Sequence, residues 1–114
     1  MNQADRGQRQ AFVTPIDPPI VIPPQGGTVR FQVEIVNRSN VAVDFDLWTE
    51  LEVPGGGLRT GSPWALTLDA GASLTVRLQR RIPPGAPPGT YTLRCLVGTF
   101  PTADDSDSFT FVKE

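Results

Sequence analysis

The sequence predicts an all-β protein in which two antiparallel sheets pack face to face as a sandwich. Three observations predict this class. Apolar and polar residues alternate with a period of two along most of the chain, and no window repeats its apolar residues at helical spacing. The alternating runs are short and are separated by turns rich in glycine, proline and asparagine. The length of 114 residues suits a single domain with one hydrophobic core.

The composition argues against several functional classes. The chain contains no histidine, and histidine is the commonest general base near neutral pH and the commonest ligand of transition metals. The net charge is −2 and the arginines are scattered along the chain, so no basic patch for nucleic acid is expected. No segment has the run of about 18 apolar residues that a transmembrane helix needs. We therefore expect a protein that is not an enzyme, holds no cofactor, binds no nucleic acid and does not insert into a membrane.

The chain starts with a polar segment, residues 1–11, which we expect to form an arm in front of a sandwich domain at residues 12–114. The arm lacks the apolar stretch of a secretory signal peptide. Behind it, the apolar run at 18–24 is enclosed by prolines, which cannot donate a hydrogen bond to a strand ladder. We therefore expect this run to form an edge strand.

Two long strands are expected next. In residues 28–37 alternate apolar positions build one face of a strand, and a polar turn at 37–40 ends it. In residues 41–53 the apolar positions again alternate with polar ones, several of them carboxylates. The side chains expected to point into the core from these two strands are Val29, Phe31, Val33, Ile35, Val41, Val43, Phe45, Leu47, Leu51 and Val53.

The second half of the chain supplies the remaining strands, which are expected at 64–69, 73–80, 90–98 and 107–112. The connection at 82–91 contains Pro-Pro-Gly twice, and its prolines and glycines are typical of a stiff link between sheets. Cys95 is the single cysteine and is expected to be buried as a small apolar residue. Together the runs predict an immunoglobulin-like two-sheet antiparallel β-sandwich of about seven strands.

The order of several short motifs resembles a known family. Over residues 13–113 the chain is similar to immunoglobulin-like (fibronectin III-like) modules of secreted and surface proteins of environmental bacteria. The motifs that carry the resemblance are the proline-enclosed run at 18–24, the Gly26-Gly27 turn, the asparagine turn at 37–40, Trp48 in the next strand, the Pro87-x-Gly89-x-Tyr91 loop and the closing Asp107-Ser108-Phe109-x-Phe111 strand.

The resemblance implies a non-catalytic module, extracellular or on the cell surface, of the kind that is commonly joined to larger proteins. The chain departs from antibody-type domains in two respects. It lacks their paired cysteines, and Tyr91 stands four residues before Cys95, whereas the tyrosine of those domains stands two residues before a cysteine. The spacing therefore does not predict a tyrosine corner.

Trp48 is the first candidate for a contact surface. Alternation places it on the outward face of its strand, together with Asp44, Asp46 and Glu50. An aromatic ring among carboxylates is typical of a surface that stacks on a sugar ring or anchors a protein partner. A β-bulge or covering loops would bury the ring instead, since sandwiches often bury a tryptophan in this strand.

An acidic cluster, Asp104, Asp105 and Asp107, is the candidate metal site. Calcium prefers carboxylate and carbonyl oxygens from such segments. It takes about six to eight of them, which is more than this segment supplies by itself. The alternative to a calcium site is a solvated turn in front of the last strand.

The arm is the candidate assembly element, with Arg9, Phe12 and Val13 as its contact residues. If it forms a strand, it pairs either with an edge of its own domain or with an edge of a neighbouring subunit. The second route would build oligomers or filaments. Our first hypothesis is a structural or interaction module whose partner is itself or a neighbouring domain. The alternative is a carbohydrate-binding accessory module that holds polysaccharide through an exposed Trp48.

Overall fold

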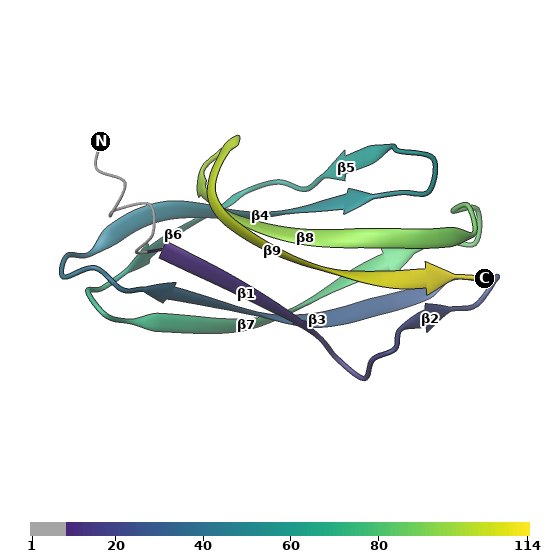
Figure 1. Ribbon diagram of the computed structural model, residues 1–114, viewed down its shortest axis with the longest axis horizontal. Helices are drawn as coiled ribbons and strands as arrows, with labels where there is room; N and C mark the ends of the chain where they lie inside the picture. The colour runs from purple at the N-terminus through teal and green to yellow at the C-terminus, as the bar shows by residue number, and fades with distance from the viewer. Residues whose placement is uncertain (1–8) are drawn as a thin grey trace.

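The strands of the protein form two sheets that pack face to face (Figure 1). The computed structural model describes residues 9–114. Within these residues all the regular secondary structure is β-strand, and no helix that could span a membrane is found. The smaller sheet has the order β1 (Arg9–Pro15), β3 (Gly27–Asn37) and β7 (Ser73–Ile82). The larger sheet has the order β2 (Val21–Ile22), β9 (Thr102–Lys113), β8 (Gly89–Thr99), β4 (Val43–Glu52) and β5 (Leu58–Thr60), and β6 (Trp64–Leu68) also pairs with β4. The predicted all-β, two-sheet sandwich is confirmed.

Two of the nine strands in the described part of the chain are additional to the seven expected in the sandwich, namely β1, which begins in the expected arm, and β5. β1 starts in a polar segment and forms because it pairs with β3, from Arg9 opposite Asn37 to Pro15 opposite Phe31. β5 has only three residues beside a glycine-rich stretch, and β4 supplies its pairing partner. The proline-enclosed run is β2, which lies at the edge of the larger sheet as predicted and pairs in parallel with the end of β9.

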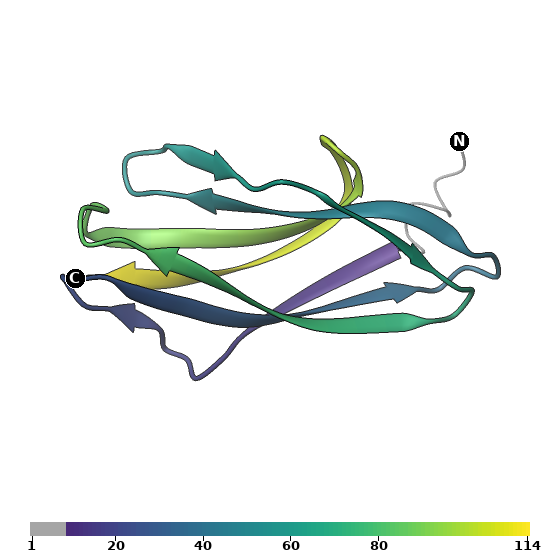
Figure 2. The same cartoon turned by 180° about the vertical axis from the view of Figure 1, so that it is seen from behind.

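The core lies between the two sheets, which the view from behind shows as two layers of strands (Figure 2). It follows the alternation of the sequence, except that Val41, which was expected to point inward, is 58% exposed in the turn before β4. The inward side chains of β3 are at most 2% exposed. Phe31 of the smaller sheet meets Phe109 of the larger sheet with ring centroids 5.8 Å apart, and Tyr91 stacks on Phe111 at 5.1 Å. Cys95 is fully buried as expected. This burial raises the pKa of its thiol to about 12, and the neighbouring Asp107 carboxylate adds to the effect.

Asn37 ties the turn after β3 to the turn after β6. Its side chain is fully buried, and Nδ2 donates to three carbonyl oxygens, those of Val41, Leu68 and Asp69, at 2.9, 3.1 and 3.0 Å. Its Oδ1 accepts a hydrogen bond from the backbone N–H of Ser39 at 3.0 Å. A buried amide with all these partners is stabilising because none of its polar atoms loses water without replacement.

The link between β7 and β8 forms a tyrosine corner. The Tyr91 hydroxyl at the start of β8 donates to the backbone oxygen of Pro87 at 2.5 Å, which is the contact that defines such a corner. The Tyr91–Cys95 spacing did not predict this corner, because the contact needs an upstream carbonyl and does not involve the cysteine. A turn within the link, in which Ala86 N–H donates to Pro83 O at 3.1 Å, brings that carbonyl into place.

Candidate interaction site

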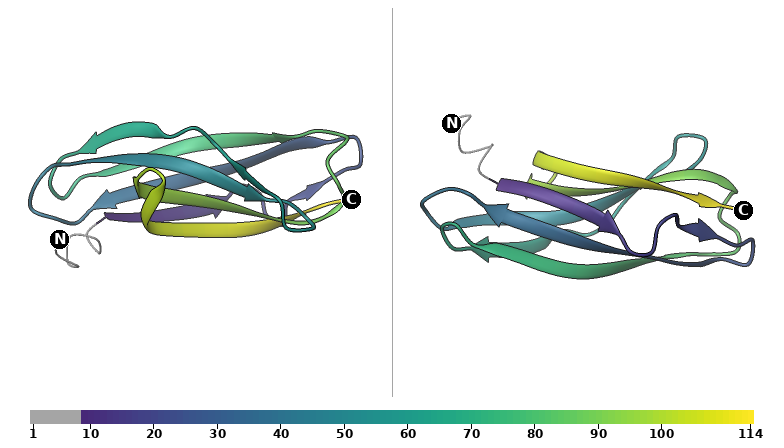
Figure 3. Two further views of the ribbon diagram at one scale, coloured as in Figure 1. Left: turned by 90° about the horizontal axis from the view of Figure 1, so that it is seen from above. Right: turned by 60° about the horizontal axis from the view of Figure 1, so that its bottom comes forward.

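The edges of β1 and β9 lie side by side although the two strands belong to different sheets (Figure 3). Side chains of β9 join them. The Asp105 carboxylate accepts a hydrogen bond from the backbone N–H of Ala11 at 2.9 Å, and Asp107 accepts one from Val13 N–H at 2.8 Å. We call these two contacts the carboxylate clamp.

Alternation explains why the clamp forms. In β9 the aspartates Asp105 and Asp107 are on the same face as Phe109 and Phe111, so their carboxylates point toward the sandwich interior near the edge of β1. In β1 the N–H groups of alternate residues point away from β3 and need another acceptor. A carboxylate on the neighbouring edge supplies that acceptor, and it does so at the edge where a foreign strand would otherwise pair.

The acidic cluster therefore lies within a strand and serves the fold. Asp104 also contributes, since its Oδ2 lies 2.7 Å from the Arg9 guanidinium in an ion pair that is largely buried. Within residues 9–114 no group of three or more acidic or cysteine side chains is arranged to hold a metal ion. This arrangement does not favour the calcium hypothesis, because hydrogen-bond donors of β1 take oxygens that calcium would need. The cluster is not a turn in front of the last strand either, because β9 starts at Thr102.

The contact residues predicted for the arm, Arg9, Phe12 and Val13, are all in β1. β1 takes the intramolecular one of the two routes considered, because it pairs with β3 of its own domain. Val13 faces the core, whereas Phe12 is 41% exposed on the other face. The remaining residues of the predicted arm, 1–8, lie outside the described residues. The clamp occupies the outer edge of β1, so this edge is not free to accept a strand from a neighbouring subunit.

Trp48 is on the outward face of β4 as alternation predicts, but it is only 1% exposed. The ring of Phe100, in the turn between β8 and β9, meets it edge-on at 5.1 Å and 84°. Leu96 lies opposite Trp48 in the register of β4 and β8, and that register is unbroken from Asp46 to Glu52. The contact-surface interpretation of Trp48, which needs an exposed ring, was therefore wrong, and its alternative is confirmed: a covering turn buries the ring, without a bulge in β4. Trp48 offers no face for stacking on a sugar.

The carboxylates beside Trp48 are engaged within the chain. Asp46 Oδ2 accepts the backbone N–H of Phe100 at 3.0 Å and so holds the covering turn in place. Asp44 accepts the Thr67 hydroxyl at 2.6 Å, and Glu50 lies 3.5 Å from the Arg94 guanidinium. The predicted contact set thus stabilises the outer face of the larger sheet. Asp44 and Asp46 also line a cavity of about 420 Å³ that lies on the paired strands β4 and β6, next to Thr99.

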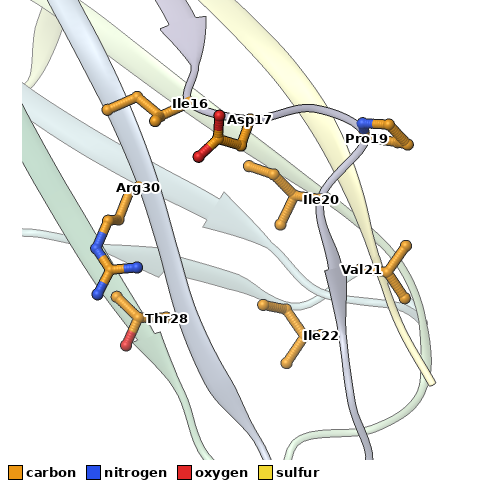
Figure 4. Close-up of a pocket in the computed structure, with 8 residues that line it drawn as sticks. All are labelled: Ile16, Asp17, Pro19, Ile20, Val21, Ile22, Thr28 and Arg30. Atoms are coloured by element: carbon orange, nitrogen blue, oxygen red, sulfur yellow. The ribbon is translucent and has the colours of Figure 1, made fainter.

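A small pocket of about 240 Å³ lies between the β1–β2 link and β3 (Figure 4). Its walls carry one charge of each sign: Asp17 lies on the β1–β2 link near Ile20, and Arg30 of β3 lies across the pocket from Ile20 and Ile22 (Figure 4). The mixture of charges gives this pocket no preference for an anion or a cation.

A different cavity brings together arginines that the sequence keeps apart. It measures about 420 Å³ and lies where β5 and the end of β7 face each other across the open side of the sandwich. Arg59 of β5 and Arg80 and Arg81 of β7 line it. Its floor is apolar and is formed by Leu51, Val53, Ile82, Ala86 and Tyr91. We call this cavity the arginine mouth.

The sequence reasoning missed the arginine mouth because it took the arginines as scattered. One signal was present. Leu74, Val76 and Leu78 occupy alternate positions of one strand and face inward. Arg80 is the next residue of this series, so the alternation places a charged side chain on the inward face. Arg59 was not placed at all, because β5 was not predicted.

No protein-family model and no curated protein matches the chain. Solved structures do. The chain is similar, over 94% of its length, to part of the alkylpurine DNA glycosylase AlkC of Pseudomonas fluorescens bound to DNA containing an abasic site analog (TM-score 0.76, 17% identity). It is similar over 92% to the CARDB domain of a Pyrococcus furiosus protein in complex with di-metal ions (TM-score 0.68, 12% identity). It is similar over 92% to part of β-glucuronidase 2 of Bacteroides uniformis (TM-score 0.71, 12% identity).

The share of each matched protein differs. The chain spans 91% of the CARDB domain but only 30% of the DNA glycosylase and 14% of the glucuronidase. At these identities the likeness concerns the fold alone. It agrees with the coarse part of the resemblance seen in the sequence, a small sandwich domain of the immunoglobulin-like kind.

Proposed function

We propose that this chain is a non-catalytic structural or interaction module, extracellular or on the cell surface, whose partner is a neighbouring domain or another protein. The observation that carries the proposal is how the chain uses its carboxylates. Each candidate acidic residue accepts a hydrogen bond from, or forms an ion pair with, another part of the chain; these residues are Asp44, Asp46, Glu50, Asp104, Asp105 and Asp107. Carboxylates held in this way join strands and are poorly placed to move protons during a reaction.

The solved structures support a modular role. In the glycosylase and the glucuronidase the part that resembles this chain is a minor share of a longer protein. The CARDB domain matches nearly from end to end, which supports a fold that stands as a unit. A unit of this kind acts through its surface. In the arginine mouth positive charges gather that have no ion-pair partner within residues 9–114.

A turnover assay tests the non-catalytic part of the proposal. The cavity on β4 and β6 is lined by two carboxylates, Asp44 and Asp46, and acid–base hydrolysis would need such a pair. We expect the purified chain to release no more product than buffer from chromogenic glycoside, ester and phosphate substrates. Turnover above the blank that disappears in the Asp44→Asn/Asp46→Asn variant would overturn the proposal.

Labelling of intact cells tests the proposed location. An antibody against the chain is expected to label unpermeabilised cells of the source organism as strongly as permeabilised ones. Labelling that requires permeabilisation would place the module inside the cell and would contradict this part of the proposal.

A further inference from the structure

The arginine mouth places positive charges on the inward sides of two opposing edges. Arg59 lies opposite Leu51 in the register of β5 and β4, so it is on the same face as a core residue. Arg80 occupies an inward position of β7 and is partly buried. Both therefore point from their own sheet toward the open space between the sheets, above an apolar floor.

These arginines have no anionic partner in the described part of the chain. The ion pairs there are Arg9 with Asp104 and Arg94 with Glu50. None of the hydrogen bonds of the described side chains involves Arg59, Arg80 or Arg81. Like charges that face one another across a partly apolar cavity repel, and an anion placed between them would relieve that repulsion.

The same side of the sandwich leaves a strand edge open. Among the described strands, β7 is the last of the smaller sheet and pairs with β3 alone. Its inward side chains Leu74, Val76 and Leu78 are only partly buried, although they pack on the core. The edge therefore offers free backbone groups and incompletely covered apolar side chains in one line, with Arg80 at the end of that line.

An inward charge on an edge strand usually prevents pairing with other strands. Here the sign of the charge makes the edge selective. An apolar or basic strand laid along β7 would bury Arg80 without a partner, which is costly. A strand that carries a carboxylate at that position would form a bidentate hydrogen-bonded pair with the guanidinium.

We infer that the arginine mouth and the free edge of β7 bind an extended segment of a partner protein, in which alternate residues are apolar and one carboxylate enters the mouth. This inference rests on the proposed function, because it names the surface by which the module would interact. The apolar floor favours a carboxylate on a peptide over a nucleic-acid backbone. Nucleic acid needs a basic stripe that follows regularly spaced phosphates, whereas these arginines form one cluster in a chain of net charge −2.

Fluorescence anisotropy with paired peptides tests the inference. The probe is a fluorescein-labelled peptide of alternating valine and serine with one glutamate, and its counterpart has glutamine at that position. The full chain is expected to bind the glutamate peptide about tenfold more tightly than the glutamine peptide. A fluorescein-labelled oligothymidylate serves as the nucleic-acid probe and is expected not to bind.

Three variants locate the site. Arg59→Gln and Arg80→Gln are each expected to abolish the preference for glutamate. Arg77→Gln is the matched control, since it removes the same charge from an exposed position of β7 that does not line the mouth, and it is expected to keep the preference. Thermal unfolding of each variant confirms that it is folded before binding is measured.

Equal binding of the two peptides, no binding of either, or binding that Arg77→Gln weakens as much as Arg80→Gln would overturn the inference. Tighter binding of the oligothymidylate than of the glutamate peptide would overturn it in favour of phosphate recognition. None of these outcomes bears on the turnover assay, so the inference and the proposed non-catalytic role fail separately.

Discussion

The backbone N–H of Val13 donates to the Asp107 carboxylate at 2.8 Å, across 94 positions of the sequence. Val13 belongs to the smaller sheet and Asp107 to the larger one, so this bond joins the two layers at their shared edge (Figure 3). The bond replaces the backbone partner that β1 lacks on that side, and the Asp105 bond to Ala11 repeats the arrangement two residues earlier. The N-terminal strand is thereby fixed to its own domain at both of its edges.

Loss of the carboxylate clamp is expected to destabilise the domain. Asp107→Ala leaves the Val13 N–H without its acceptor in a partly buried site, which costs about 1–3 kcal/mol of unfolding free energy. Asp107→Asn is expected to lose less, because its amide oxygen still accepts. Urea unfolding measures both, with Ser106→Ala as the exposed control on the same strand. An Asp107→Ala midpoint equal to that of the control would refute the role of the clamp.

Trp48 is expected to contribute to stability rather than to binding. Trp48→Ala removes a side chain that is 1% exposed and breaks its contact with Phe100, so it should lower the unfolding free energy by about 3–5 kcal/mol. Phe100→Ala, which uncovers Trp48, should cost less. Chemical denaturation monitored by tryptophan fluorescence measures the changes. A Trp48→Ala variant as stable as the parent would mean that the ring is not packed as described.

The hydrogen bond of the tyrosine corner is expected to make a modest contribution to the free energy of unfolding. Tyr91→Phe keeps the stacked ring on Phe111 and removes only the hydroxyl that donates to Pro87, at a cost of about 1 kcal/mol. Thermal unfolding of the two proteins, at equal pH and salt, measures the difference. A loss of several kcal/mol would contradict this prediction, because it would show that the substitution disturbs the ring as well.

Cys95 is expected to make the fold sensitive to alkali. Burial and the Asp107 carboxylate raise the pKa of the thiol from 9.0 to about 12. The folded state therefore holds its proton at pH values where the unfolded chain has lost it, and the resulting stability is present below pH 9.0 and is lost as the pH rises toward about 12. Cys95→Ala should show a shallower decline over this range in urea unfolding. Identical declines in the two proteins would refute the effect.

A strand could be predicted from the sequence wherever apolar and polar residues alternate within that strand. The inward row of β3, which includes Val29 and Phe31, was predicted correctly because burial of one face dictates that pattern. The partner of β1 was left open between two routes, since its pairing depends on β3 and on carboxylates near the far end of the chain. A local pattern carries no information about such partners.

The candidate sites were harder to predict for the same reason. Alternation placed Trp48 on the correct face, but its exposure depends on Phe100 in a distant turn. Asp105 and Asp107 were recognised as an acidic cluster, but the sequence did not show that their hydrogen-bond donors are N–H groups of β1. Arg59 and Arg80 meet only because the edges of two sheets face each other. In each case the residue type was visible in the sequence, and its tertiary neighbour decided its role.

Amide hydrogen exchange at Ala11 and Val13 tests most directly whether β1 is clamped to its own domain. These N–H groups point away from β3, so only the Asp105 and Asp107 carboxylates protect them. We predict that they exchange as slowly as the amides of Gln10 and Phe12 in the parent protein, and much faster in the Asp105→Ala/Asp107→Ala variant. Rapid exchange at Ala11 and Val13 in the parent, or slow exchange that the variant leaves unchanged, would contradict the clamp.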